Sequence, residues 1–218
     1  MPELDFALVG AEVPVAAAAP TLLFRLQVSN RLPAEPVRSV ALRAQIQIEA
    51  ARRQYGPAAQ ALLLEVFGEP WRWGETLRSL LWTHVGTVVP AFEEQIEVEL
   101  PVLCTYDFEV VSTKYLAALE SEEGTIPLRF LFSGTVFYEG AEGRLQVAPI
   151  PWSKEATFEL PVRCWRELIA RFYPASAWLR LQRQVFDRLY AYKLAHGLPT
   201  WDETVLHLLA AAEGKVKP

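Results

Sequence analysis

The chain has 218 residues, of which 51% are hydrophobic and 22% are charged, and its formal net charge is −5. This length and composition fit one sizeable folded domain or two small ones, and they exclude a disordered chain. The negative charge argues against a general nucleic-acid binder, which needs a basic surface to displace counterions. No run of about 18 uncharged apolar residues occurs, so we expect no membrane span.

The N-terminal segment and the cysteines bear on the compartment. The segment MPELDFALVG carries acids where a secretory signal peptide carries bases. Two cysteines in 218 residues agree with a reducing compartment and do not suggest a disulfide scaffold. We therefore expect a cytoplasmic protein.

Alternating apolar and polar residues predict strands through the first two-thirds of the chain. In residues 37–49 the apolar positions point one way and the polar positions the other, which is typical of an antiparallel sheet with one dry face. Residues 126–140 are aromatic and β-branched, and they predict a central strand with a bulge near Gly134. Other segments with a strand pattern are 21–30, 80–89, 93–104, RLQVAPI and KEATFELPV.

Helical signals interrupt the strands once and then dominate the end of the chain. Residues 56–68 predict a helix with Pro57 in its first turn and Gly68 as its stop. From about Arg163 the apolar period becomes helical, and a helix over 175–196 would carry two apolar stripes. The first stripe contains Trp178, Leu181, Val185, Leu189 and Tyr192, and the second contains Leu179, Phe186 and Tyr190. The phrase TWDE, residues 200–203, predicts a capping box that starts a final helix.

These elements predict a mainly β (α+β) fold. We expect an antiparallel β-sandwich of roughly seven to nine strands, with a helical insert and a C-terminal helical pair. Residues 1–162 would form the sandwich with its insert near 56–80, and residues 163–218 the helices packed on it. We expect one integrated domain, because no Gly/Ser-rich linker separates the two parts.

A repeated phrase contains both cysteines: ELPVLC at 99–104 and ELPVRC at 159–164. Proline lacks the N–H that a sheet ladder needs, so each copy should be an edge strand or a strand nearing its end. We favour two similar strands that each close with a small buried thiol. A disulfide, a metal or redox site and a duplication are the alternatives. No C-x-x-C occurs and no histidine lies near either cysteine, so we predict no metal site and no cofactor.

Two places suggest a protein-binding surface. In EPWRWGE, residues 69–75, Trp71 and Trp73 flank Arg72, and tryptophan and arginine are enriched at binding hot spots. The alternative is that both tryptophans cap the sandwich core. The second place is the outward face of helix 175–196, with Arg180, Arg183 and Tyr190. One apolar stripe suffices to dock this helix on the sandwich, so the second stripe needs the final helix, a second copy or another protein.

A different hypothesis places a small apolar ligand or cofactor inside the sandwich, near Phe130, Phe132 and Phe137. A third would use Cys104, Cys164 and His84 in an enzyme or metal carrier. No nucleophile elbow, P-loop, metalloprotease helix or dinucleotide fingerprint is present. We therefore assign no catalytic residue and expect a protein that is not an enzyme.

Phrases along nearly the whole chain resemble an uncharacterised bacterial family that we associate with gene clusters of actinobacterial-type nickel–iron uptake hydrogenases. They are TLLFRLQVSN, VALRAQIQIE, LLWTHVGTVVPAF, ELPVLCTYDFEV, IPLRFLFSGTVF, PIPWSKEATFELPV and LPTWDETV. The resemblance implies an accessory, maturation or assembly role. It also implies a hydrogenase subunit or maturation factor as the protein partner.

Overall fold

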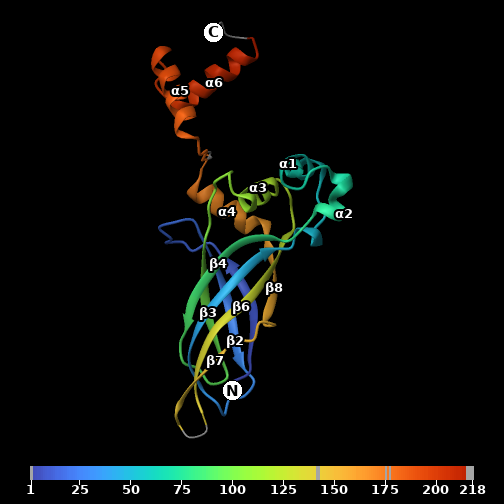
Figure 1. Cartoon of the computed structure of the whole chain (residues 1–218), viewed down its shortest axis with the longest axis vertical. Coiled ribbons are helices and arrows are strands. Elements are labelled where there is room, and N and C mark those ends of the chain that lie inside the picture. The colour runs from blue at the N-terminus through green and yellow to red at the C-terminus, as the bar shows by residue number, and fades with distance from the viewer. Residues whose placement is uncertain (1, 141–142, 175, 177, 215–218) are drawn as a thin grey trace. The chain divides into compact units, whose positions relative to one another are not determined.

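The computed structural model describes residues 2–140, 143–174, 176 and 178–214 (Figure 1). These residues form eight strands in two antiparallel sheets, with six α-helices and two short 3-10 helices, which confirms the mainly β (α+β) prediction. The strands are β1 (Leu4–Glu12), β2 (Thr21–Asn30), β3 (Val37–Ile48), β4 (Leu80–Val89), β5 (Gln95–Leu103), β6 (Thr125–Glu139), β7 (Leu145–Pro149) and β8 (Glu155–Pro161). The helices are η1 (Ala50–Arg52), α1 (Pro57–Phe67), η2 (Pro70–Arg72), α2 (Trp73–Thr76), α3 (Val111–Ala118), α4 (Val162–Phe172), α5 (Arg183–Ala195) and α6 (Trp201–Ala212).

The chain divides into two compact units, Met1–Trp178 and Leu179–Pro218. The first unit holds all eight strands and the helices up to α4, and the second holds α5 and α6. Helix α4, which we had grouped with the C-terminal helices, therefore belongs with the strands. The packing of the last two helices on the sandwich stays a prediction.

The first unit is built from two facing sheets. One has the strand order β1-β2-β5, and the other has the order β4-β3-β6, with β7 and β8 both paired to the far side of β6. Phe6 of β1 stacks on Phe132 of β6 with ring centroids 4.4 Å apart. Phe24 of β2 packs edge-on against Phe130 of β6 at 5.2 Å. These contacts join the two inner faces into one core, as in a sandwich.

Strand β6 is central, as its composition predicts, and Gly134 is essential to its path. Gly134 has φ +140°, and a Cβ there would lie 2.0 Å from the carbonyl oxygen of Ala41 on β3. The pairing of β3 with β6 continues through Leu42 and Gly134, so the bulge that we expected at this glycine is absent. The register shifts at the start of β3 instead, between Val37 and Ser39.

Helices close one end of the first unit (Figure 1). Helix α1 begins at Pro57 and stops at Gly68, which has φ 72°, as predicted. It buries Leu63 and Phe67, while α3 buries Tyr115 and Leu116. Helix α4 is strongly amphipathic and buries Val162, Trp165, Leu168 and Ile169.

The second unit is a helical hairpin, and its first helix starts later than predicted. Helix α5 begins at Arg183, because Trp178 is held elsewhere: it forms a parallel β-bridge with Asp107 and packs edge-on against Tyr173. Residues 175 and 177 of the predicted helix lie outside the described residues. The Thr200 half of the predicted capping box is confirmed, since the Thr200 hydroxyl accepts a 3.1 Å hydrogen bond from the Glu203 N–H. Among the described residues, no helix is both long and apolar enough to cross a membrane.

Candidate binding surfaces

The two copies of the repeated phrase lie in different sheets. ELPVLC ends β5, an edge strand of the three-stranded sheet, and ELPVRC ends β8, which pairs only with β6. The prolines thus sit where a missing N–H is tolerated, as predicted. Cys104 follows its strand and is buried. Cys164 instead lies in the first turn of α4, because Pro161 ends β8 and the helix begins at the next residue.

Both cysteines are free thiols, and their surroundings favour the protonated form. Burial raises the pKa of Cys104 to about 12, and burial also raises the pKa of Cys164. A reactive cysteine needs the opposite, an electropositive site that favours the thiolate. The described residues contain no group of three or more His, Cys, Asp or Glu side chains that could hold a metal ion.

The tryptophans of EPWRWGE point to different places. Trp73 is only 8% exposed, donates its indole N–H to the Gly68 carbonyl at 2.8 Å, and packs edge-on against Tyr55. It belongs to the core, so we remove Trp73 from the candidate surface. Trp71 is 81% exposed, and the Arg72 guanidinium lies 5.8 Å from its ring centroid. The core alternative therefore holds for Trp73, whereas Trp71 lies at the surface.

The three phenylalanines of the ligand hypothesis are not equivalent. Phe130 and Phe132 are buried and pack against Phe24 and Phe6 of the facing sheet. Phe137 is half-buried at an odd-numbered position of β6, whereas the nearest buried positions on either side of Gly134, Phe132 and Val136, are even-numbered. The structure thus brings two of the three rings together, in a site that aromatic side chains fill.

The hairpin carries an aromatic cluster, which we define as Phe186, Tyr190 and Trp201. Their ring centroids lie 5.3 to 6.2 Å apart, and each side chain is between 37% and 47% exposed. Two cations flank the cluster: Arg183 lies 5.9 Å from the Phe186 ring, and Lys193 lies 5.8 Å from the Trp201 ring.

Sequence reasoning selected Arg183 and Tyr190 in this region and missed their aromatic neighbours. Phe186 stood in the second apolar stripe, three and four residues from these two positions, which was the available signal. Trp201 was noted only within the capping box, and the short turn at 196–200 is what brings it back to α5. Arg180 precedes α5 and does not lie on the helix that we predicted for it. It is exposed and makes no ion pair with the residues that the structure describes.

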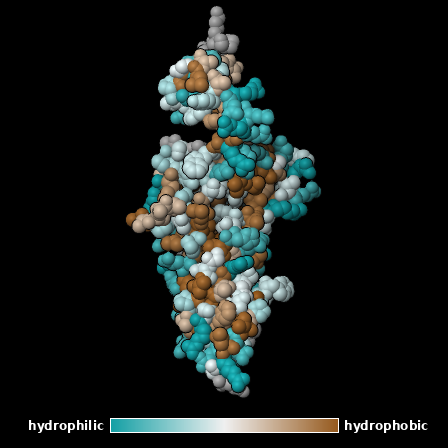
Figure 2. All heavy atoms as spheres, turned by 60° about the vertical axis from the view of Figure 1, so that its left-hand side comes forward, coloured by the Kyte–Doolittle hydropathy of each residue, from teal (hydrophilic) through white to brown (hydrophobic). Residues whose placement is uncertain are grey.

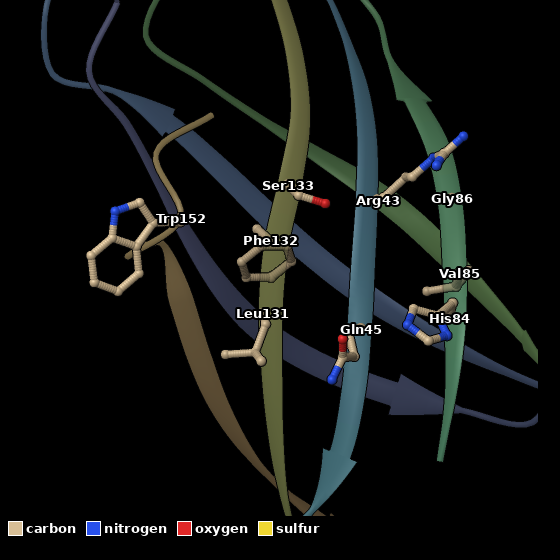
Figure 3. A pocket seen from close by; sticks show the side chains of 9 residues that line it. All are labelled: Arg43, Gln45, His84, Val85, Gly86, Leu131, Phe132, Ser133 and Trp152. Atoms are coloured by element: carbon tan, nitrogen blue, oxygen red, sulfur yellow. The ribbon is translucent and has the colours of Figure 1, made fainter. Parts of the chain in front are cut away.

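A groove crosses the outer face of the five-stranded sheet in the first unit (Figure 3). It has a volume of about 560 Å³. Strands β3, β4 and β6 form most of it, and the turn between β7 and β8 supplies Trp152 at one side. The lining residues are Arg43, Gln45, His84, Val85, Gly86, Leu131, Phe132, Ser133 and Trp152. His84, which we had considered as a catalytic or metal residue, is exposed here.

Comparison with known proteins identifies the family. The family described as "Family of unknown function (DUF6084)" matches residues 1–217. The chain belongs to this family. No curated protein matches it.

Several solved structures share a limited likeness with this DUF6084 chain, among them β-glucosidase 3B from Thermotoga neapolitana in complex with α-D-glucose. The match has a TM-score of 0.23 and 13% sequence identity, and it covers 72% of the DUF6084 chain and 17% of the glucosidase. At this TM-score the likeness carries no argument about function.

Proposed function

We propose that this DUF6084 protein is a non-enzymatic, cytoplasmic accessory protein that binds another protein through its C-terminal hairpin. The observation that carries the proposal is the aromatic cluster of Phe186, Tyr190 and Trp201 with its flanking cations. Aromatic residues and arginine dominate the binding energy of many protein interfaces, because they combine large apolar area with a polar or charged group.

The small core of the hairpin supports the same proposal. Its helices have 13 and 12 residues, and within this unit only Thr204 is buried among the described residues. Two helices of this length do not bury enough apolar area to be stable alone. Large apolar side chains remain exposed along both helices: Val185, Leu194, Val205, Leu206 and Leu209. A partner surface that covers them would stabilise the hairpin and gain affinity from the same area.

The resemblance to a family encoded with nickel–iron hydrogenases supplies the candidate partner, a hydrogenase subunit or maturation factor. The protein would then work in the maturation or assembly of such a hydrogenase. Trp71 and Arg72 form a second, smaller candidate surface in the first unit. A second copy of the chain is the competing occupant of the hairpin.

The test is an affinity pull-down of the tagged full chain from its native host, grown under conditions that induce hydrogenase. The variants are Tyr190→Ala/Trp201→Ala, Trp71→Ala, and Leu103→Ala as an exposed apolar control in the first unit. We expect the wild type and the control to capture hydrogenase subunits or maturation proteins. The hairpin variant should capture at least tenfold less of these proteins. The single variant Arg180→Glu should weaken capture without altering the fold.

Two results would contradict the proposal. One is equal capture by the wild type and the hairpin variant. The other is a stable dimer in light scattering that the same variant converts to monomer, with no hydrogenase protein captured by either form.

A further inference from the structure

The groove on the outer face of the five-stranded sheet is positioned by strand register. Arg43 on β3 lies opposite Gly86 on β4 and opposite Ser133 on β6. Neither neighbour carries a side chain large enough to cover the guanidinium, and Arg43 is exposed. In the adjacent row, Gln45 lies between His84 and Leu131. The sheet therefore presents several hydrogen-bond donors side by side on one face.

A fixed turn adds an aromatic ring to this face. The Phe132 N–H donates to the Lys154 carbonyl, and the Ile150 N–H donates to the Gly134 carbonyl, both at 2.9 Å. The Lys154 N–H closes the turn on the Pro151 carbonyl at 3.1 Å. Trp152 stands within this turn and is 92% exposed. Figure 3 shows its indole at one side of the groove, with Arg43 and His84 at the other.

The charges of the groove favour an anion. None of its nine lining residues is acidic, and Arg43 makes no ion pair with any described residue. Glu155 is the acid in the same row as Gln45, and it lies beyond Leu131 without lining the groove. Arg43 can therefore offer its planar fork of donors to a carboxylate or phosphate, the two groups whose geometry matches it.

The apolar side of the groove indicates which group the ligand carries beside its anion. Leu131 lies on β6, the strand next to β3, and Trp152 stands in the turn on the far side of β6. Both therefore offer an apolar contact on the side of the groove away from β4. The volume of about 560 Å³ falls within the range of small-molecule sites. We propose that this groove binds a small organic anion, with its carboxylate or phosphate on Arg43 and its flat apolar body against Trp152 and Leu131.

The test is a titration of the ¹⁵N-labelled full chain with 2-naphthylacetate and 2-naphthyl phosphate, followed by NMR. The neutral 2-naphthylacetamide controls for the charge. We expect saturable shifts at Gly86, Ser133 and the Trp152 indole with one or both anions, and at least tenfold weaker binding of the amide. The anion that binds more tightly identifies the headgroup.

Matched variants locate the interaction. Arg43→Gln and Trp152→Ala should each weaken binding about tenfold, because both side chains are exposed and neither supports the core. Arg25→Gln removes the same charge from the other sheet and should leave affinity within twofold. Equal binding of acid and amide, equal loss in Arg43→Gln and Arg25→Gln, shifts confined to the hairpin, or no saturable binding at millimolar concentration would each overturn the proposal.

Discussion

The two units of this chain treat their aromatic residues in opposite ways. In the sandwich, Phe24 is fully buried and contacts rings from three other strands. In the hairpin, Phe186 also contacts two aromatic rings, yet it and both neighbours stay more than a third exposed. Ring contact alone therefore does not make a core. A core also needs surrounding layers that remove the rings from water, and two helices do not supply them.

From this difference we propose different roles for the two units. The sandwich is a self-sufficient support whose side chains are mostly committed to packing. In the hairpin the large apolar side chains lie outside the small core that its two helices form, and we propose that a partner covers them. Substitutions in the first unit should thus lower the free energy of unfolding, whereas matched substitutions in the second should lower affinity for a partner.

The largest expected effect comes from truncating one phenylalanine in each unit. Phe24→Ala should lower the free energy of unfolding of the sandwich by about 3 to 5 kcal/mol, through lost burial and the cavity left behind. Phe186→Ala should change the same quantity by less than about 1 kcal/mol, because a partly exposed ring loses little burial. Urea unfolding followed by near-ultraviolet circular dichroism measures both. Similar losses from the two variants would abolish the distinction between the units.

Each unit has a glycine with a positive φ, and replacing each by alanine compares how well the two backbones tolerate strain. Gly134→Ala forces a strained φ and a clash with the Ala41 carbonyl, so it should cost about 3 kcal/mol. Gly197, at the end of α5, also has a positive φ of 62°, but nothing lies within 4 Å of an added Cβ. Gly197→Ala should therefore cost only about 1 kcal/mol. Far-ultraviolet circular dichroism would show this loss as a small decrease in the helix signal of the hairpin. A sandwich unaffected by Gly134→Ala would show that β6 can shift away from β3.

Features set by neighbouring residues were predictable from the sequence. The ends of α1 follow from Pro57 and Gly68, and the start of α6 follows from the Thr200 hydroxyl. The edge positions of β5 and β8 follow from prolines that lack a ladder donor. Each of these depends on a few adjacent residues and on no distant contact.

Features set by distant residues were not predictable. Trp71 and Trp73 are two positions apart in one turn, and contacts with Tyr55, Phe67 and the Gly68 carbonyl select Trp73 as the buried one. The groove depends equally on register, because Gly86, Arg43 and Ser133 come from three strands and share one row. Alternation shows that these side chains share a face of some sheet, but it does not show which strands are neighbours or which residues align.

The burial of Cys104 should make the free energy of unfolding depend on pH. The pKa of Cys104 is raised from 9.0 to about 12, chiefly by burial, so above pH 9 the unfolded chain loses this proton before the folded chain does. The contribution of Cys104 to the free energy of unfolding is thus fully present below pH 9, and it should fall by about 1.4 kcal/mol per pH unit between 9 and 12.

Urea unfolding at pH 8 and pH 10 should show a smaller pH-dependent loss of the free energy of unfolding in Cys104→Ala than in the wild type. Cys164→Ala is the control, because this thiol is only partly buried. An unchanged pH dependence in Cys104→Ala would show that Cys104 is accessible to water.

The smallest effect concerns the helix cap of the hairpin. Thr200→Ala removes the acceptor for the Glu203 N–H and should destabilise α6 by about 1 kcal/mol. Thr200→Ser keeps a hydroxyl at the same place and should retain most of the stability. Amide hydrogen exchange reports the two units separately, so protection should fall in α6 of the alanine variant while the strands of the sandwich stay unchanged. Because the hairpin has so little core of its own, this one hydrogen bond is a large share of what holds α6 in place, and a protein partner should restore the lost protection. Loss of protection in the sandwich strands would instead mean that the two units unfold together.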